Sequence, residues 1–199
     1  MKQNKLIRTL AVLLTTTFWA CVATAQQAKP TASRALELST FGGVSADYTG
    51  LSGGRNGSLS VGVDLAFAPY RGLRPTVELR GLYPLDKGTI VSQKAGFGGL
   101  RVDFLLGHRA HPYGDFLFGR GQMDYGTGGY LYNDYNYLVT TTYVYSPGAG
   151  VDLDLTRRLA IKLDGQYQSW GDTPTASTTV HSTIATVGLV YRFGQRGVF

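Results

Sequence analysis

The stretch LSVGVDLAF, residues 59–67, has a large apolar side chain at every odd position and a small or charged one at every even position. Residues 151–155 (VDLDL) and 161–167 (IKLDGQY) follow the same period. Successive side chains of a β-strand point to opposite faces, so each stretch predicts a strand with one apolar and one polar face. This alternation is the main evidence that the chain folds as an all-β protein.

Eight such strands are predicted, at residues 35–47, 58–68, 74–83, 95–106, 113–125, 143–156, 159–170 and 180–193. Most are close to the roughly 9–11 residues with which a tilted strand crosses a bilayer. Short links follow the second, fourth and sixth strands, and longer links rich in Gly, Asn, Thr and Tyr follow the others. Short turns opposite long loops are typical of membrane barrels. We therefore expect an all-β, eight-stranded antiparallel up-and-down transmembrane β-barrel.

The composition supports this expectation. The chain has 27 glycines and 13 tyrosines, which favour turns and strands. It contains no apolar run of about 18 or more residues, which excludes a bundle of transmembrane helices. Aromatic residues lie near the predicted strand ends, where a bilayer places its headgroups. We expect Phe67, Phe104, Tyr191 and Phe193 toward the periplasmic side, and Tyr83, Tyr143, Tyr167 and Trp170 toward the outer side. A soluble secreted β-sandwich gives the same alternation of side chains but no alternation of link lengths.

The first residues have the layout of a secretory signal. Lys2, Lys5 and Arg8 precede an apolar run, and the sequence ATA that ends at residue 25 fits the small-residue cleavage pattern. Cys21 is the only cysteine and lies inside this signal, so the mature chain can form no disulfide. The alternative is a lipoprotein signal that is acylated at Cys21.

The expected division is a cleaved signal peptide at 1–25, a short periplasmic segment at 26–34 and the barrel domain at 35–199. Cleavage removes three of the 19 basic residues and none of the 13 acidic ones, which leaves a mildly basic chain. Nucleic-acid binding usually needs a concentrated basic face, so we expect no nucleic-acid partner.

The last predicted strand, TVGLVYRF at 186–193, resembles the closing strand of OmpA-like outer-membrane barrels. YVYSPGAGVDLDLT at 143–156 is similar to the glycine-rich sixth strand and turn of that family, and 159–167 is similar to the next strand. The resemblance implies an integral protein of the outer membrane of a Gram-negative bacterium, exported through the periplasm. Its expected partners are outer-membrane lipids, lipopolysaccharide and the barrel assembly machinery.

The same resemblance implies a C-terminal assembly signal made by aromatic residues of the closing strand, Tyr191 and Phe193. A second terminal aromatic residue, Phe199, follows after residues 194–198, so the signal can end at either phenylalanine.

If the apolar faces meet lipid, a set of charged side chains of both signs faces the lumen: Asp64, Glu78, Arg80, Arg101, Asp103, Asp152, Asp154, Lys162 and Asp164. Side chains fill an eight-stranded barrel, and buried charges need partners, so we expect a paired, hydrated plug rather than an open pore. The sequence does not fix the pairs. Asp115 and Arg120 are five positions apart, so in a regular strand their side chains point to opposite faces and cannot both face the lumen. We therefore expect either a bulge between them or a position of Asp115 outside the hydrocarbon zone.

The three histidines give little sign of catalysis. His108 and His111 flank a predicted turn, where turn chemistry explains them, and they lack a third zinc ligand. His181 is able to pair with Ser169 or Asp172 across the seventh loop, which keeps a lipid A-modifying enzyme as an alternative. We expect no catalytic residue, no cofactor and no metal.

The loop at 126–142 is rich in Tyr, Gly and Asn, a composition suited to binding a host surface, a phage or a glycan. The alternative is a flexible, solvated loop with no dedicated partner. The sequence thus predicts a monomeric, non-enzymatic outer-membrane barrel with a structural or surface-binding role. A narrow porin-like channel for small solutes is the first alternative.

Overall fold

The computed structural model describes residues 36–51, 54–85, 91–106, 109–126, 128–173 and 179–193. These residues form the strands β1 (Leu36–Tyr48), β2 (Arg55–Phe67), β3 (Leu73–Pro84), β4 (Val91–Phe104), β5 (Ala110–Tyr125), β6 (Tyr130–Tyr132), β7 (Tyr135–Tyr137), β8 (Val139–Asp154), β9 (Leu159–Trp170) and β10 (Val180–Arg192). Within them, no helix is long and apolar enough to cross a membrane. The predicted signal peptide, His108 and Phe199 lie outside the described residues.

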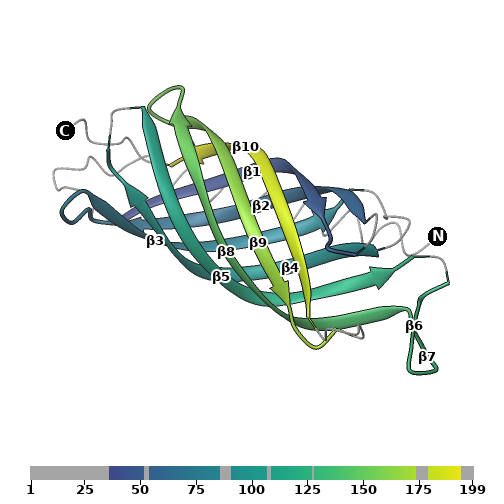
Figure 1. Ribbon diagram of the computed structural model, residues 1–199. Coiled ribbons are helices and arrows are strands. Elements are labelled where there is room, and N and C mark those ends of the chain that lie inside the picture. The colour runs from purple at the N-terminus through teal and green to yellow at the C-terminus, as the bar shows by residue number, and fades with distance from the viewer. Residues whose placement is uncertain are drawn as a thin grey trace, which may run out of the picture. The chain divides into compact units, whose positions relative to one another are not determined.

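Eight of the strands form one closed antiparallel barrel in the order β1-β10-β9-β8-β5-β4-β3-β2 (Figure 1). The barrel closes where β1 pairs with β10, from Ser39↔Arg192 to Tyr48↔Thr183. Closure leaves no strand edge unpaired. The predicted eight-stranded up-and-down barrel is confirmed.

The two ends of the barrel differ. Four or five residues join β2 to β3, β4 to β5 and β8 to β9, and we call this the short-turn end. The connections at the opposite end, the loop end, contain between six and thirteen residues. The longest of them includes the β6–β7 hairpin, which extends from the barrel (Figure 1). Its turn residues Asn133 and Asp134 have φ angles of 48° and 63°, which suits the two-residue turn of a tight hairpin.

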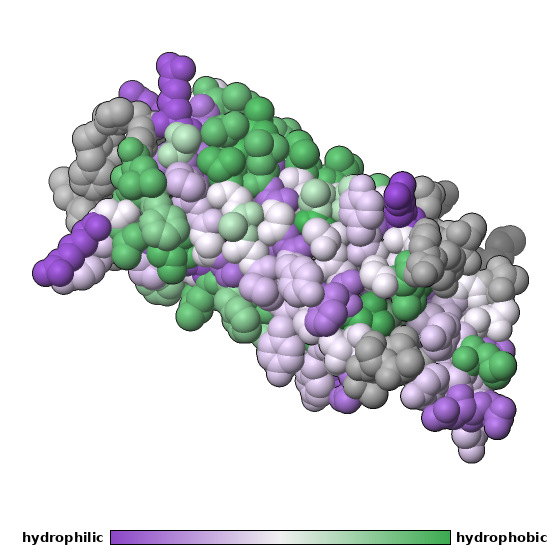
Figure 2. Space-filling model, viewed as in Figure 1, coloured by the Kyte–Doolittle hydropathy of each residue, from purple (hydrophilic) through white to green (hydrophobic). Residues whose placement is uncertain are grey.

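The outer face of the barrel is apolar over the half that includes the short-turn end. Figure 2 shows hydrophobic residues gathered over the part of the barrel that is farther from the β6–β7 hairpin. Exposed members of this belt come from every barrel strand, and include Leu38, Val63, Leu79, Leu100, Phe116, Phe118, Tyr145, Leu163, Val187 and Leu189. A belt of this extent needs an apolar environment.

On β5, the inner and outer faces exchange character toward the loop end. Its inward side chains change from polar to apolar in the order His111, Tyr113, Asp115, Leu117 and Met123. Its outward side chains change from apolar to polar in the order Phe116, Phe118, Arg120, Gln122 and Asp124. On β5 the loop end therefore has an apolar inner face and a polar outer face, whereas the inward residues of β1 and β2 stay mostly polar as far as Asp47 and Asn56.

Two sequence-based expectations are wrong. The register of β5 is continuous against both β4 and β8, so β5 has no bulge at Asp115. Asp115 is buried inside the barrel, whereas Arg120 points outward, as the regular alternation of a strand requires. Trp170 lies at the loop end of β9, as expected, but its side chain does not face the lipid headgroups, because it is fully buried in the apolar cluster.

Candidate functional site

The predicted lumen charges all lie inside the barrel, on the inner faces of β2, β3, β4, β8 and β9. All of these side chains are buried except that of Asp154, which is 15% exposed. The structure divides these charges into three groups along the barrel and adds residues that the sequence interpretation left out.

The first group surrounds Arg80 near the middle of the barrel. The Arg80 guanidinium lies 2.6 Å from Glu78 Oε1, 2.6 Å from Asp164 Oδ1 and 3.5 Å from Asp115 Oδ2. Gln166 Nε2 donates hydrogen bonds of 3.0 Å to both oxygens of Asp115. A guanidinium with its planar set of donors suits this arrangement of carboxylates, because it can satisfy several of them at once.

Lys162 completes the first group. Its Nζ lies 4.0 Å from Glu78 Oε2 and is held between two rings, 4.3 Å from the centroid of Phe41 and 4.5 Å from that of Tyr113. The ring faces attract the ammonium group and fill the space around it. Tyr113 also donates a hydrogen bond of 2.8 Å to Asp164, so an aromatic layer crosses the lumen at this level.

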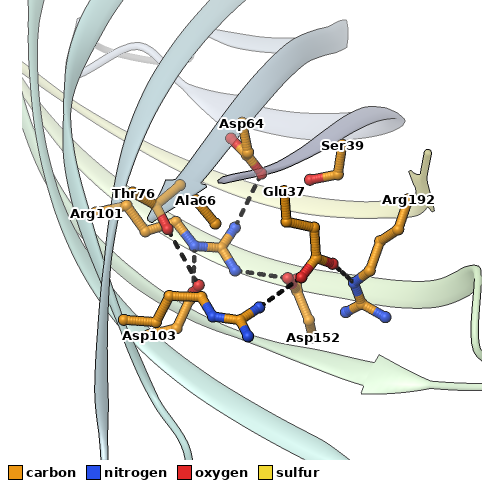
Figure 3. Close-up of a pocket in the computed structure, with 10 residues that line it drawn as sticks. Glu37, Ser39, Asp64, Ala66, Thr76, Arg101, Asp103, Asp152 and Arg192 are labelled. Atoms are coloured by element: carbon orange, nitrogen blue, oxygen red, sulfur yellow. Dashed lines mark hydrogen bonds and ion pairs between the residues drawn. The ribbon is translucent and has the colours of Figure 1, made fainter. Parts of the chain in front are cut away.

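The second group surrounds Arg101, nearer the short-turn end. Its guanidinium nitrogens lie 2.5 Å from Asp152 Oδ2, 2.6 Å from Asp103 Oδ1 and 3.3 Å from Asp64 Oδ2. Figure 3 shows the Arg101 side chain directed at these carboxylates, which reach it from three strands. The guanidinium stacks on the Tyr113 ring at 3.6 Å, which connects the second group to the first.

The third group closes the short-turn end. Arg74 lies 2.7 Å from Glu37, and Arg192 lies 3.7 Å from Glu37 and 2.7 Å from Asp154. His111 Nε2 is 3.1 Å from Asp154 Oδ2. Turn chemistry therefore does not explain His111, which lies in β5 and points into the barrel. Glu37, Arg74 and Arg192 were missed, although each has the inward parity of its strand.

Together, the described residues of the three groups comprise five Lys or Arg side chains and eight carboxylates. The cavity that remains between the second and third groups has a volume of about 20 Å³ (Figure 3). That volume holds about one water molecule. Paired side chains therefore fill most of this part of the lumen.

An apolar cluster occupies part of the lumen at the loop end. The cluster consists of Leu82, Val91, Phe97, Leu117, Met123, Tyr125, Val144, Trp170, Val180 and Ile184. Trp170 is fully buried and packs against Gly121, where a Cβ atom would collide with the indole. Residue composition alone gave no sign of this cluster, because its members are dispersed over six strands.

The residues weighed for catalysis do not form a site. His181 is exposed on the outer face and stacks on Tyr167, with 5.4 Å between the ring centroids. Ser169 is its cross-strand partner, but no hydrogen bond joins His181 to Ser169 or Asp172 in the described part of the chain. Nor do the described residues contain a group of three or more His, Cys, Asp or Glu side chains placed to hold a metal ion.

Two of the aromatic residues predicted to form the assembly signal, Tyr191 and Phe193, lie together at the short-turn end. Both are exposed, and their rings meet edge to face at 5.1 Å. Phe199, the third, falls outside the described residues. The pair places aromatic surface at the boundary of the apolar belt.

No protein-family model matches the chain, and no curated protein matches it at a significant level. Among solved structures, the chain is similar to Neisserial surface protein A, with a TM-score of 0.51 and 14% identity over 79% of this chain and 96% of that one. The fold is that of an eight-stranded outer-membrane β-barrel.

Two other barrels of this fold are similar at lower scores. For Ail of Yersinia pestis the TM-score is 0.42, with 10% identity over 79% of this chain and 97% of that one. OprG from Pseudomonas aeruginosa gives a TM-score of 0.44, with 10% identity over 82% of this chain and 99% of that one.

Proposed function

We propose that the protein is an integral outer-membrane barrel that is closed to solutes and presents a rigid, tyrosine-rich hairpin at the cell surface for binding. The observation that carries the proposal is the filled lumen, with ion pairs in one half and an apolar cluster in the other. Such an interior stabilises a scaffold and obstructs a channel.

The apolar belt supports insertion in a bilayer. On β3, outward residues from Leu73 to Tyr83 are all apolar, aromatic, proline or glycine. With about 3.3 Å per residue and a tilt of about 40°, this stretch covers about 25 Å, the height of the apolar band of an outer-membrane barrel. The loop end then extends beyond the bilayer, which explains why its exterior is polar.

The hairpin supports a binding role. Tyr130 packs on Tyr125, with 5.5 Å between ring centroids, and so joins the hairpin to the barrel. Leu131, Tyr135 and Leu138 remain 62–72% exposed. Tyrosine provides a large contact area at little entropy cost, and an element already fixed by its turn loses little freedom on binding.

Single cysteines test the location and orientation. Tyr135→Cys places a thiol on the hairpin, and Arg157→Cys places one in the turn between β8 and β9. On intact cells, a membrane-impermeant maleimide is expected to label Tyr135→Cys and to label Arg157→Cys only after the outer membrane is permeabilised. Equal labelling of both variants on intact cells would contradict a membrane-spanning barrel in this orientation.

Binding is tested with the barrel in lipid nanodiscs on an array of cell-surface glycans. The comparison is a variant in which Gly-Ser replaces residues 131–136. We expect the glycans retained by the wild-type barrel to be lost by this variant while its heat-modifiable mobility on gels is kept. Identical retention by both proteins, or none by either, contradicts glycan binding through the hairpin.

A further inference from the structure

A set of buried polar atoms at the loop end has no protein hydrogen-bond partner. The set consists of both carboxylate oxygens of Asp47, Oδ1 of Asn56, Oγ of Ser58 and Nε2 of Gln93. Each of these side chains belongs to a residue that is at most 8% exposed. Buried polar groups are nearly always satisfied, so a concentration of unsatisfied atoms in one part of the lumen needs an explanation.

The register of the strands brings these atoms together. Asp47 on β1 is the cross-strand partner of Asn56 on β2, and both side chains point inward. Side chains that face each other in this way have Cβ atoms about 4.5–5.5 Å apart. Ser58 is the next inward residue of β2, so it lies diagonally across from Asp47.

Gln93 reaches the same region from β4. Its Oε1 accepts a hydrogen bond of 3.0 Å from Ser182 on β10, and the same hydroxyl lies 3.2 Å from the carbonyl oxygen of Thr49. These contacts hold the Gln93 amide beside the end of β1, two residues after Asp47.

Among the described residues, Asp47 has no counter-charge. Its cross-strand partner on the other side is Ile184, a member of the apolar cluster at the loop end. An isolated carboxylate in the protein interior is strongly unfavourable unless it takes up a proton or a positive charge joins it, and a proton on Asp47 would still leave the Asn56 and Ser58 oxygens unsatisfied.

We propose that Asp47, Asn56 and Ser58 bind a single Ca²⁺ ion inside the loop end of the barrel. A carboxylate, an amide oxygen and a hydroxyl are oxygen ligands of the kind that hard cations take, and an ion satisfies the acceptors and the charge together. Water alone supplies donors but leaves the charge. Ca²⁺ suits the set better than Mg²⁺, because it accepts irregular geometry and completes its shell readily with water.

The site has a structural consequence for the first loop. Asp47 and Asn56 stand at the base of the loop between β1 and β2, where Thr49 N donates a hydrogen bond of 3.0 Å to Gly54 O. An ion held by both strands fixes the two ends of this loop. With one carboxylate among its ligands, the site has the low affinity of extracellular calcium modules, about 10⁻⁴–10⁻³ M.

The test is urea unfolding of the full barrel in vesicles of zwitterionic phosphocholine lipid, which does not compete for the ion as anionic lipid does. Compared with EDTA, about 5 mM Ca²⁺ is expected to raise the ratio of folded to unfolded protein about 6- to 50-fold. This range follows from the dissociation constants given above, because a ligand that binds only the folded state raises the ratio by a factor of one plus its concentration divided by its dissociation constant. Asp47→Asn is expected to abolish the response and to be more stable than the wild type in EDTA. Asp134→Asn, an exposed aspartate in the hairpin turn, is the matched control and keeps the full response.

Three results would overturn the proposal. The first is a wild-type barrel whose unfolding is unchanged by Ca²⁺. The second is an Asp47→Asn variant that responds as the wild type does, because the ion would then bind elsewhere. The third is a stoichiometry other than one Ca²⁺ per barrel in calorimetric titration of the folded protein.

Discussion

Replacing Arg101 with methionine gives the sharpest test of the lumen network. Methionine keeps much of the side-chain volume but removes the guanidinium, which lies 2.5–3.3 Å from carboxylate oxygens of Asp64, Asp103 and Asp152. Removing one partner of a buried ion pair costs about 3–5 kcal/mol, because the other partner stays buried without compensation. Three carboxylates lose their cation in this variant, so we expect the free energy of unfolding to fall by about 5 kcal/mol, the upper end of that range.

The matched control is Arg120→Met, which removes the same group from the outer face. The Arg120 guanidinium lies 5.1 Å from the centroid of the exposed Tyr143 ring, a contact worth about 0.5–1 kcal/mol at an exposed site. Urea unfolding in phosphocholine vesicles, followed by the fluorescence of the buried Trp170, measures both variants. The other tryptophan, Trp19, belongs to the predicted signal peptide.

A second variant separates the charge from the packing. Asp103→Asn and Asp152→Asn, added to Arg101→Met, remove two of the three unpaired charges and are expected to restore more than half of the loss. If Arg101→Met costs no more than Arg120→Met, or if the neutralising changes restore nothing, then ion pairing does not stabilise the lumen and this reasoning is refuted.

Two further changes test the apolar cluster and the belt. Gly121→Ala places a methyl group against the Trp170 indole and should destabilise the barrel by about 1–3 kcal/mol with a shift in tryptophan emission, whereas Gly96→Ala, where a Cβ meets open space, should do neither. Val187→Lys puts a charge near the middle of the belt and should cost about 2–4 kcal/mol in vesicles. Thr183→Lys, on the same face of β10 beyond the belt, should cost about 0–1 kcal/mol, and equal costs would contradict the assigned position of the bilayer.

The barrel could be predicted from the sequence because its strands repeat one pattern of period two and because its links alternate between short and long. Leu159–Trp170 was predicted with its observed bounds, and the other barrel strands differ by a few residues at most. The inward direction of Arg80 and Lys162 follows from the same alternation, which needs no information beyond the strand itself.

The pairing of side chains inside the lumen could not be predicted, because it depends on contacts between strands that are distant in the chain. Asp115 lies 3.5 Å from Arg80 only because β5 and β3 are both adjacent to β4 in a narrow barrel. The apolar cluster around Trp170 was missed because the expected polarity of the lumen was extended over the whole length of each strand. The β6–β7 hairpin was predicted as an irregular loop, since the turn at Asn133 was not identified.

The central claim is that the barrel is a closed scaffold, and single-channel conductance of the refolded chain in a planar bilayer tests it most directly. The measurement needs a heat-modifiable, inserted protein and salt on both sides. We predict no conductance steps for the wild-type barrel. Steady steps that scale with salt, and that change when Arg80 or Arg101 is replaced, would show that the lumen conducts and would contradict the account.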